Sequence, residues 1–171
     1  MLKYFKKTYS DKEIELFDFQ RKNPLLETLT DDELSKFQAY IYTRTYKENE
    51  VVFFTGDPSH ALYIVRKGVV SLNLEIKGEF EKLMILRNGG VFGDNSILEK
   101  TKRIYTAIVL TDGAELMVIP KVNLVEIMEH NQTIKAKMMY SFAKMYNNYT
   151  IKLFETYKSS RGFFDLNTVY S

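Results

Sequence analysis

The chain has 171 residues, 45% hydrophobic and 27% charged, which is enough apolar material for one folded domain and excludes a disordered or fibrous protein. Its 24 basic residues nearly balance its 22 acidic ones, so the net charge of +2 gives no general reason to bind nucleic acid or an anionic membrane. It contains no cysteine, which excludes disulfides, thiolate catalysis and cysteine-ligated zinc. The sequence has no apolar run of signal-peptide or membrane-span length, and we therefore expect a cytoplasmic protein with no membrane partner.

Residues 1–41 predict helices. An Asn-Pro pair interrupts the first helical stretch. Thr30 and Glu33 then fit a capping box, in which Thr30 is the N-cap and Glu33 occupies the third helical position. A helix is expected from there to about Tyr40, with Leu34 and Phe37 on its buried face.

Residues 42–119 carry short β-branched and aromatic runs, separated about every ten residues by turns that mostly contain glycine, as in small all-β folds. Seven strands are predicted: Tyr42–Tyr46, Val51–Phe54, Ala61–Arg66, Val69–Ile76, Phe80–Leu86, Ile104–Leu110 and Ala114–Ile119. Together they predict an antiparallel β-roll of the jelly-roll type.

Residues 120–158 predict two helices, a short one over Lys121–Glu129 and a long one over Gln132–Lys158, with a break at His130-Asn131. One apolar stripe of the long helix recurs every three or four residues, at Ile134, Met138, Phe142, Met145, Tyr149 and Leu153. At about 27 residues, or about 40 Å, this helix is longer than a small roll can cover, which favours a homodimer formed through it.

The expected fold class is therefore α+β, with a β-roll flanked by N-terminal helices and a long C-terminal helix. Residues 1–158 are expected to form one domain, made of residues 1–41, 42–119 and 120–158. Residues 159–171 are expected to be a tail.

The connection between the fifth and sixth predicted strands is long for a β fold and holds polar residues. It contains Gly89-Gly90-Val91-Phe92-Gly93-Asp94-Asn95-Ser96-Ile97-Leu98 and is followed by Arg103. A short helical turn is expected to begin at Asp94, and the amides of Asn95, Ser96 and Ile97 would then converge on a phosphate. Arg103 supplies a charge-assisted contact to an anion, and Asp94 suits a sugar hydroxyl. The segment predicts a site for a sugar phosphate.

Two stretches resemble the cyclic nucleotide-binding domain, the β-roll shared by bacterial catabolite-activator-type regulators and kinase regulatory subunits. The family's phosphate-binding cassette commonly reads Phe-Gly-Glu-x-Ala-Leu and, after a short loop, Pro-Arg-x-Ala; this chain has Phe92-Gly93-Asp94-Asn95-Ser96-Ile97 and Lys102-Arg103-Ile104-Tyr105. Upstream, Gly56-Asp57, Tyr63-Ile64-Val65 and Gly68-Val69-Val70 resemble the family's strand-and-turn signature. The resemblance covers roughly residues 25–158.

The resemblance implies a non-enzymatic sensor that binds cAMP or cGMP at this turn and moves its C-terminal helices about His130-Asn131, with no other cofactor. The implied ligand-binding residues are Gly93, Asp94, Asn95, Ser96, Ile97, Arg103, Ile104, Tyr105, Tyr149 and Thr150. In the family the glutamate, here Asp94, accepts from the ribose 2′-hydroxyl, and the arginine, here Arg103, neutralises the phosphate. Tyr149 and Thr150 fall where the family's long helix reaches the purine.

Other interpretations remain open. Arg103 and Asp94 are also interpretable as a surface ion pair, and Tyr149 as part of the apolar stripe. Ile104 and Tyr105 replace small residues beside the phosphate, which favours an alternative in which the fold no longer binds nucleotide and serves as a dimerisation or protein-interaction scaffold. A metal enzyme of cupin type is disfavoured, because the chain has only two histidines. The dozen residues after the long helix are too few for a helix-turn-helix module, so we expect no direct DNA binding and an unknown protein partner.

Overall fold

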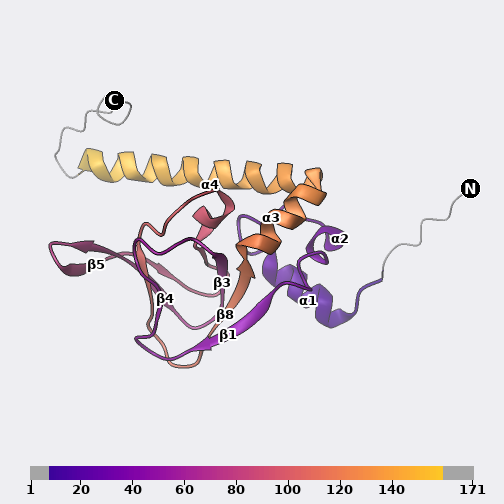
Figure 1. Ribbon diagram of the computed structural model, residues 1–171, viewed down its shortest axis with the longest axis horizontal. Helices are drawn as coiled ribbons and strands as arrows, with labels where there is room; N and C mark the ends of the chain where they lie inside the picture. The colour runs from indigo at the N-terminus through magenta and orange to yellow at the C-terminus, as the bar shows by residue number, and fades with distance from the viewer. Residues whose placement is uncertain (1–7, 160–171) are drawn as a thin grey trace, which may run out of the picture.

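In the computed structural model, which describes residues 8–159, a β-roll lies beside a helical layer, and one long helix crosses above both (Figure 1). The helical elements are α1 (Asp11–Gln20), α2 (Asp31–Leu34), the 3₁₀ turn η1 (Asp94–Ile97), α3 (Lys121–His130) and α4 (Gln132–Ser159). The strands are β1 (Tyr42–Tyr46), β2 (Val51–Phe53), β3 (Ala61–Lys67), β4 (Val70–Ile76), β5 (Glu79–Leu86), β6 (Val91–Phe92), β7 (Thr106–Val109) and β8 (Ala114–Pro120).

The roll consists of two four-stranded antiparallel sheets. One sheet has the order β1-β8-β3-β6 and the other has the order β2-β7-β4-β5. A tight turn at Lys77-Gly78, with φ values of 53° and 83°, joins β4 to β5, as expected for a two-residue hairpin. This β4–β5 hairpin projects from the roll below the end of α4 (Figure 1).

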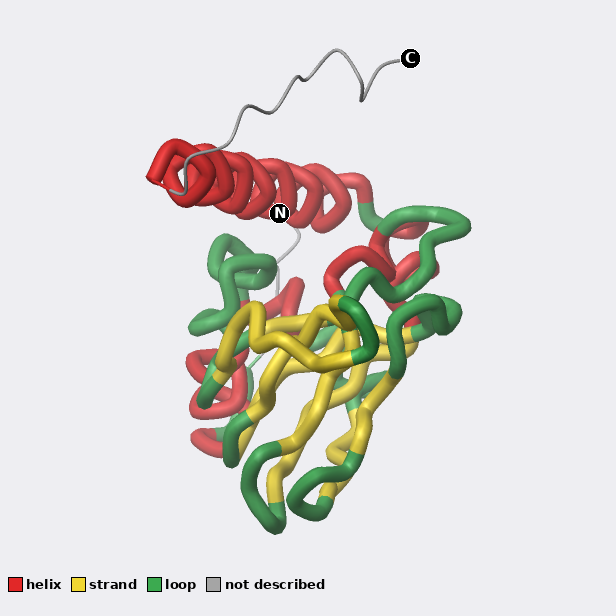
Figure 2. Tube along the Cα trace, turned by 90° about the vertical axis from the view of Figure 1, so that its left-hand side faces the viewer, coloured by secondary structure: helices red, strands yellow, loops and turns green. Residues whose placement is uncertain are grey.

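Two apolar cores hold the fold together. The inner core lies between the sheets and contains Phe53, Val65, Phe92 and Tyr105 among others. The outer core lies between the roll and the helices, so that the strand residues Leu62 and Ile119 pack with side chains from α1, α3 and α4. Figure 2 shows α4 as a separate layer that runs across the end of the roll. The connection between β6 and β7 lies close to α3, since η1 contacts both α3 and β3.

The predicted strands agree with the observed ones to within two residues at each end, apart from β6, which was not predicted. β6 has only two residues, too few to show an alternating pattern, and it forms because Tyr63 and Ile64 of β3 pair with Phe92 and Val91. The predicted α+β class is confirmed, with eight strands rather than seven.

The N-terminal helices differ from the prediction in length. The capping box is confirmed: the Glu33 amide donates to the Thr30 hydroxyl at 3.3 Å and the Thr30 amide donates to the Glu33 carboxylate at 2.8 Å. The helix expected to reach Tyr40 ends at Leu34 and continues as turns, although Leu34 and Phe37 are fully buried as predicted. Burial of these two side chains fixes their positions without requiring regular helical hydrogen bonds between them.

The C-terminal helices begin and end close to the predicted residues. Asn131 breaks the chain of helical hydrogen bonds with an extended backbone, and its side-chain oxygen accepts from the Ile134 amide at the start of α4. α4 includes Ser159, and the rest of the expected tail lies outside the described residues. Of the helices between residues 8 and 159, none is long and apolar enough to cross a membrane.

Candidate functional site

The predicted short helical turn after β6 is present, but the Ser96 amide, which was expected to point at a phosphate with those of Asn95 and Ile97, donates to the Gly93 carbonyl at 3.0 Å. Gly93 has a φ of +70°, and η1 begins directly after it with Asp94, while Asp94, Ser96 and Ile97 are buried. A Cβ atom at Gly93 would lie 2.5 Å from the Arg103 guanidinium and 2.9 Å from the Ala61 carbonyl oxygen. The turn therefore requires glycine both for its backbone conformation and for the close approach of Arg103.

Arg103 lies inside the roll and only 3% of it is exposed. Its guanidinium donates to the Gly93 carbonyl at 3.1 Å and to the Ala61 carbonyl at 2.8 Å, and it stacks 4.1 Å from the centre of the Phe53 ring. No carboxylate among residues 8–159 comes within ion-pair distance of it. The interpretation of Arg103 and Asp94 as a surface ion pair is therefore wrong.

The two sequence signatures meet at this turn. The Gly56 amide donates to the Arg103 carbonyl, and the Arg103 amide donates to the Asp57 carbonyl, both at 2.8 Å. The Asn95 side chain accepts from the Ser59 hydroxyl at 2.8 Å and donates to the Lys102 carbonyl at 2.6 Å. The Gly56-Asp57 turn thus fixes the backbone on both sides of Arg103 and helps to hold η1.

Asp94 is nearly buried, with 7% exposed, and it faces two tyrosines. The Tyr105 hydroxyl accepts from the Gly93 amide at 2.9 Å and lies 3.5 Å from the Asp94 Oδ1 atom, toward which it donates. The Tyr146 side chain of α4 also lies near the Asp94 carboxylate, close enough to oppose the rise in its pKa. Burial raises the pKa of Asp94 above its ordinary value, although the hydrogen bonds and the nearby Arg103 act in the opposite direction.

The remaining predicted ligand-binding residues differ in whether their side chains face the turn. Ile104 is 63% exposed, so its bulk points away from the turn rather than into it. Tyr149 lies on the side of α4 that faces Asp94, because it packs 5.8 Å from Tyr146 and interacts electrostatically with that carboxylate. The Thr150 hydroxyl donates to the Tyr146 carbonyl within α4, so this hydroxyl is used by its own helix.

Several residues of the site were not predicted. Phe53 and Tyr63 flank the Arg103 guanidinium, Ser59 holds Asn95, and Tyr146 lies near Asp94. Tyr146 lies in a second apolar row of α4. Because the hydroxyl of a buried tyrosine usually has a hydrogen-bond partner, this hydroxyl was the signal that could have identified it.

The arrangement offers the Arg103 guanidinium to an anion and, next to it, the Asp94 carboxylate as an acceptor of hydrogen bonds. A buried cation without a carboxylate partner is costly, and burial lowers the pKa of Arg103. Two buried polar atoms at the turn, Arg103 Nε and Ser96 Oγ, have no hydrogen-bond partner among the described residues. An anion of a bound ligand would supply acceptors for such donors and compensate the charge, while Asp94 would accept from a hydroxyl.

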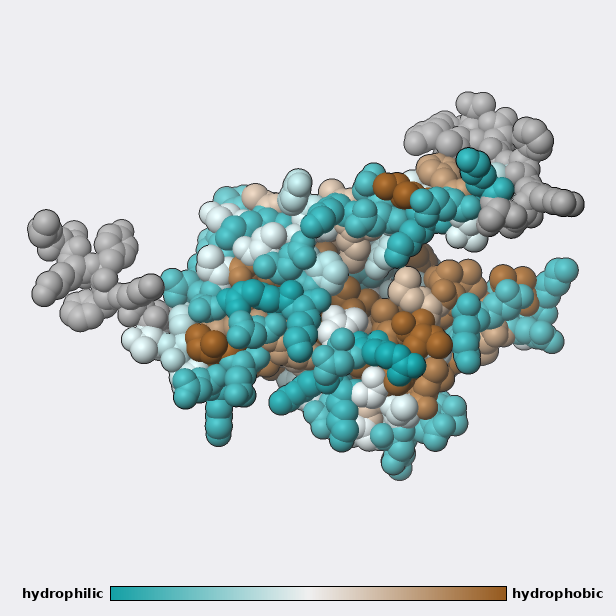
Figure 3. Space-filling view, turned by 180° about the vertical axis from the view of Figure 1, so that it is seen from behind, coloured by the Kyte–Doolittle hydropathy of each residue, from teal (hydrophilic) through white to brown (hydrophobic). Residues whose placement is uncertain are grey.

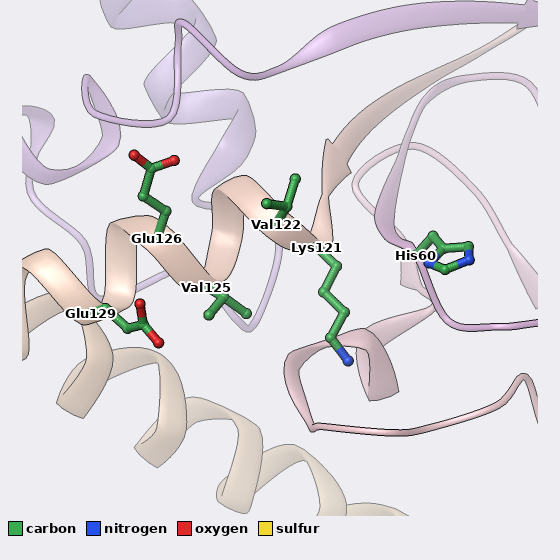
Figure 4. Close-up of a pocket in the computed structure, with 6 residues that line it drawn as sticks. All are labelled: His60, Lys121, Val122, Val125, Glu126 and Glu129. Atoms are coloured by element: carbon green, nitrogen blue, oxygen red, sulfur yellow. The ribbon is translucent and has the colours of Figure 1, made fainter.

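A separate groove lies beside α3. It has a volume of about 650 Å³ and is lined by His60, Lys121, Val122, Val125, Glu126 and Glu129. Figure 4 shows the Lys121 side chain extending from the start of α3 toward the η1 connection, where its ammonium group donates to the Leu98 carbonyl. None of the turn residues lines this groove, and no cluster of metal-ligating side chains was found within the part of the chain that the structure describes.

The sequence matches the family model for the cyclic nucleotide-binding domain over residues 43–131. The chain is 37% identical to Glutaminase 1 of Bradyrhizobium diazoefficiens over 81 residues, which are 47% of this chain and 13% of that protein. It is 31% identical to the cyclic AMP receptor protein of Thermus thermophilus over 91 residues, 53% of this chain and 42% of that protein. Both matches span less than half of the relative.

The fold is also similar to a solved structure. The N-terminal domain of a transcriptional regulator from Streptomyces coelicolor superimposes with a TM-score of 0.69 and 23% identity, covering 77% of this chain and 94% of that one. The matched family region, residues 43–131, runs from β1 to the end of α3 and contains the Arg103 turn. The chain therefore belongs to the cyclic nucleotide-binding domain family.

Proposed function

We propose that residues 1–158 form one non-enzymatic sensor domain that binds a cyclic nucleotide, cAMP or cGMP, at the Gly93–Arg103 turn. The observation that carries the proposal is the buried Arg103 guanidinium, which has carbonyl partners but no carboxylate partner in the described chain. The cyclic phosphate would compensate its charge from the side of η1. Asp94 would accept the ribose hydroxyl.

The test is calorimetric titration of the folded chain with cAMP and with cGMP, with 5′-AMP as a control for the cyclic phosphate. We expect heat of binding with one of the cyclic nucleotides and none with 5′-AMP. Arg103→Met keeps an apolar stem against Phe53 and should weaken binding at least tenfold, since a charge-assisted contact is worth about 1.5–3 kcal/mol. The matched control is Lys102→Met, which removes one exposed positive charge beside the turn. No heat at millimolar nucleotide would reject the proposal.

A second candidate is a domain that has kept the fold without the ligand. The observation that favours it is Tyr105, whose hydroxyl already bonds to the Gly93 amide and lies beside Asp94. The stability of an Arg103 variant does not separate the two candidates, because Arg103 supports the Gly93 and Ala61 carbonyls in either case. Titration with nucleotide does separate them.

We further propose that the output passes through a homodimer formed by the far end of α4. Ile151, Leu153 and Phe154 of α4 are exposed, as are Phe80 and Leu83 of the β4–β5 hairpin. Figure 3 shows apolar side chains gathered over the hairpin end of the molecule, below α4. In a two-fold dimer, the same surface of each copy faces the other copy. The far end of α4 and the β4–β5 hairpin of one copy would therefore pack against the same elements of the second copy.

Analytical ultracentrifugation tests the dimer. Leu153→Lys should shift the chain toward the monomer. Tyr140→Lys, a substitution at an equally exposed position in the other half of α4, should leave the mass unchanged. A monomeric wild-type chain at micromolar concentration would contradict the proposal.

A further inference from the structure

The buried polar groups at the turn after β6 differ in whether the protein itself supplies their hydrogen-bond partners. Arg103 Nε and Ser96 Oγ are buried donors that have no partner among the described residues. The Asp94 carboxylate, in contrast, has the Tyr105 hydroxyl beside it, 3.5 Å from the Oδ1 atom. The turn therefore holds donors that lack an acceptor, whereas its carboxylate already has a donor.

Tyr105 is held in the position from which its hydroxyl faces Asp94. It is 8% exposed and belongs to the inner core, where its ring centre lies 5.8 Å from that of Phe53. Its hydroxyl accepts from the Gly93 amide at 2.9 Å, so the single hydroxyl proton is available to the Asp94 carboxylate. Burial raises the pKa of Tyr105, which keeps this proton on the hydroxyl at neutral pH.

A donor supplied by the protein changes what a ligand hydroxyl adds at Asp94. This residue is 7% exposed, so its carboxylate depends on partners other than bulk water. A buried carboxylate without a donor is costly, and a site built around such a group strongly rejects an analogue that lacks the matching hydroxyl. With Tyr105 in place, the carboxylate keeps a donor whether or not the ligand brings one. The ligand hydroxyl then contributes little to the choice between ligands.

We propose that Tyr105 is a specificity-determining residue: its hydroxyl gives Asp94 the donor that a ribose 2′-hydroxyl would otherwise have to supply, and the turn accepts cyclic nucleotides with or without that group. This inference rests on the proposed function and adds which part of the ligand is selected. Selection falls on the cyclic phosphate, whose oxygens would accept from the unpartnered Arg103 and Ser96 donors.

Calorimetric titration of the unaltered chain with cAMP and with 2′-deoxy-cAMP measures this selection. The dissociation constant for 2′-deoxy-cAMP should exceed that for cAMP by less than about tenfold, because Asp94 keeps a donor in both complexes. If cGMP is the nucleotide that binds, the cGMP pair replaces the cAMP pair.

Tyr105→Phe removes the hydroxyl and keeps the ring in the inner core. Asp94 then depends on the ligand for this donor, so the ratio of the two dissociation constants should rise at least about tenfold above the wild-type ratio. The variant also removes the acceptor of the Gly93 amide, but this loss is common to both ligands and cancels in the ratio.

The matched control is Tyr46→Phe, a substitution of another buried tyrosine in the same core. Its ratio of dissociation constants should equal the wild-type ratio. Because the Tyr146 side chain also lies near the Asp94 carboxylate, Tyr146→Phe is titrated alongside. Circular dichroism confirms that the three variants are folded.

The outcomes separate the role of Tyr105 from the proposed function. If both nucleotides bind but the wild-type ratio exceeds about tenfold, or if Tyr105→Phe leaves the ratio unchanged, the role of Tyr105 is overturned and the proposed function stands. A ratio that rises in Tyr146→Phe and not in Tyr105→Phe overturns it in the same way. If no cyclic nucleotide binds to the wild-type chain, the proposed function fails and the role of Tyr105 fails with it.

Discussion

The two halves of α4 carry the same apolar periodicity but have different surroundings. In the near half, Ile134, Met138, Phe142 and Met145 are buried in the outer core. In the far half, Leu153 continues the same stripe, yet 65% of it is exposed. A regular stripe thus shows which face of a helix is apolar, but it does not show how far along the helix the rest of the protein buries that face.

Two ion pairs in the near half differ in how far they are buried. Lys137, in the near half, lies 2.7 Å from the Glu33 carboxylate of α2, in a partly buried position. Lys144 lies 3.1 Å from Glu27, but both side chains are exposed. The near half is therefore fixed to the N-terminal segment by packing and by a shielded charge pair, whereas Ile151, Leu153 and Phe154 in the far half are exposed.

The largest expected effect comes from truncating a buried side chain in the near half. Met138→Ala should lower the free energy of unfolding by about 3 kcal/mol, because it removes a fully buried side chain and leaves a cavity. Urea denaturation measures the change, and the melting temperature should fall by about 6–12 °C. Leu153→Ala in dilute protein should change stability by less than about 0.5 kcal/mol. Equal losses for the two variants would contradict the division of α4.

The sequence predicts most of the fold because its local signals agree with the tertiary structure. Alternating strands bounded by glycine turns place seven strand positions closely, and the Thr30 capping box marks a real helix start. β6 was missed because it forms by pairing with β3, and α2 was predicted to be longer than its four residues. Strand pairing is a tertiary effect that a local pattern does not contain.

The candidate site was predicted as a list of residues but not as an arrangement. The resemblance placed Asp94 and Arg103 together in one turn. It did not show that Arg103 donates to Ala61, 42 positions away, or that Ser59 donates to Asn95, 36 positions away. Such contacts join distant parts of the chain, and no local sequence pattern contains them.

A second prediction tests the charge pair that fixes the near half. Lys137→Met should lower the free energy of unfolding by about 2 kcal/mol at neutral pH, since it leaves the Glu33 carboxylate shielded without its partner. Lys144→Met, which breaks an exposed pair, should cost less than about 0.5 kcal/mol. Urea denaturation of both variants measures the difference. Similar losses of stability in the two variants would show that partial burial does not strengthen the Lys137–Glu33 pair.

The pH dependence of the same pair has a definite sign. Burial alone would raise the pKa of Glu33, but hydrogen bonds from Lys137 and from the Thr30 amide outweigh it, and the pKa is lowered. A lowered carboxyl pKa contributes stability above the ordinary value of about 4.3, and this contribution is lost as the pH falls through the folded value. The gap between wild type and Lys137→Met should therefore narrow when denaturation is repeated at about pH 3.

The smallest expected effect concerns Asp94, which lies where the two halves of α4 meet. Its pKa is raised because burial disfavours the carboxylate, so the folded chain binds this proton more tightly than the unfolded chain does. The sign is opposite to that of Glu33: the carboxylate of Asp94 costs stability once the pH exceeds its unfolded value, and the cost disappears as the pH falls below it. Asp94→Asn keeps an oxygen for the Tyr105 hydroxyl but carries no charge, so it should raise the free energy of unfolding by about 1 kcal/mol at pH 7. The gain should vanish below about pH 4.

Asp112→Asn, at an exposed position, should show neither effect. A less stable Asp94→Asn at pH 7 would mean that the hydrogen bond from Tyr105 and the nearby Arg103 charge outweigh the cost of burying the carboxylate.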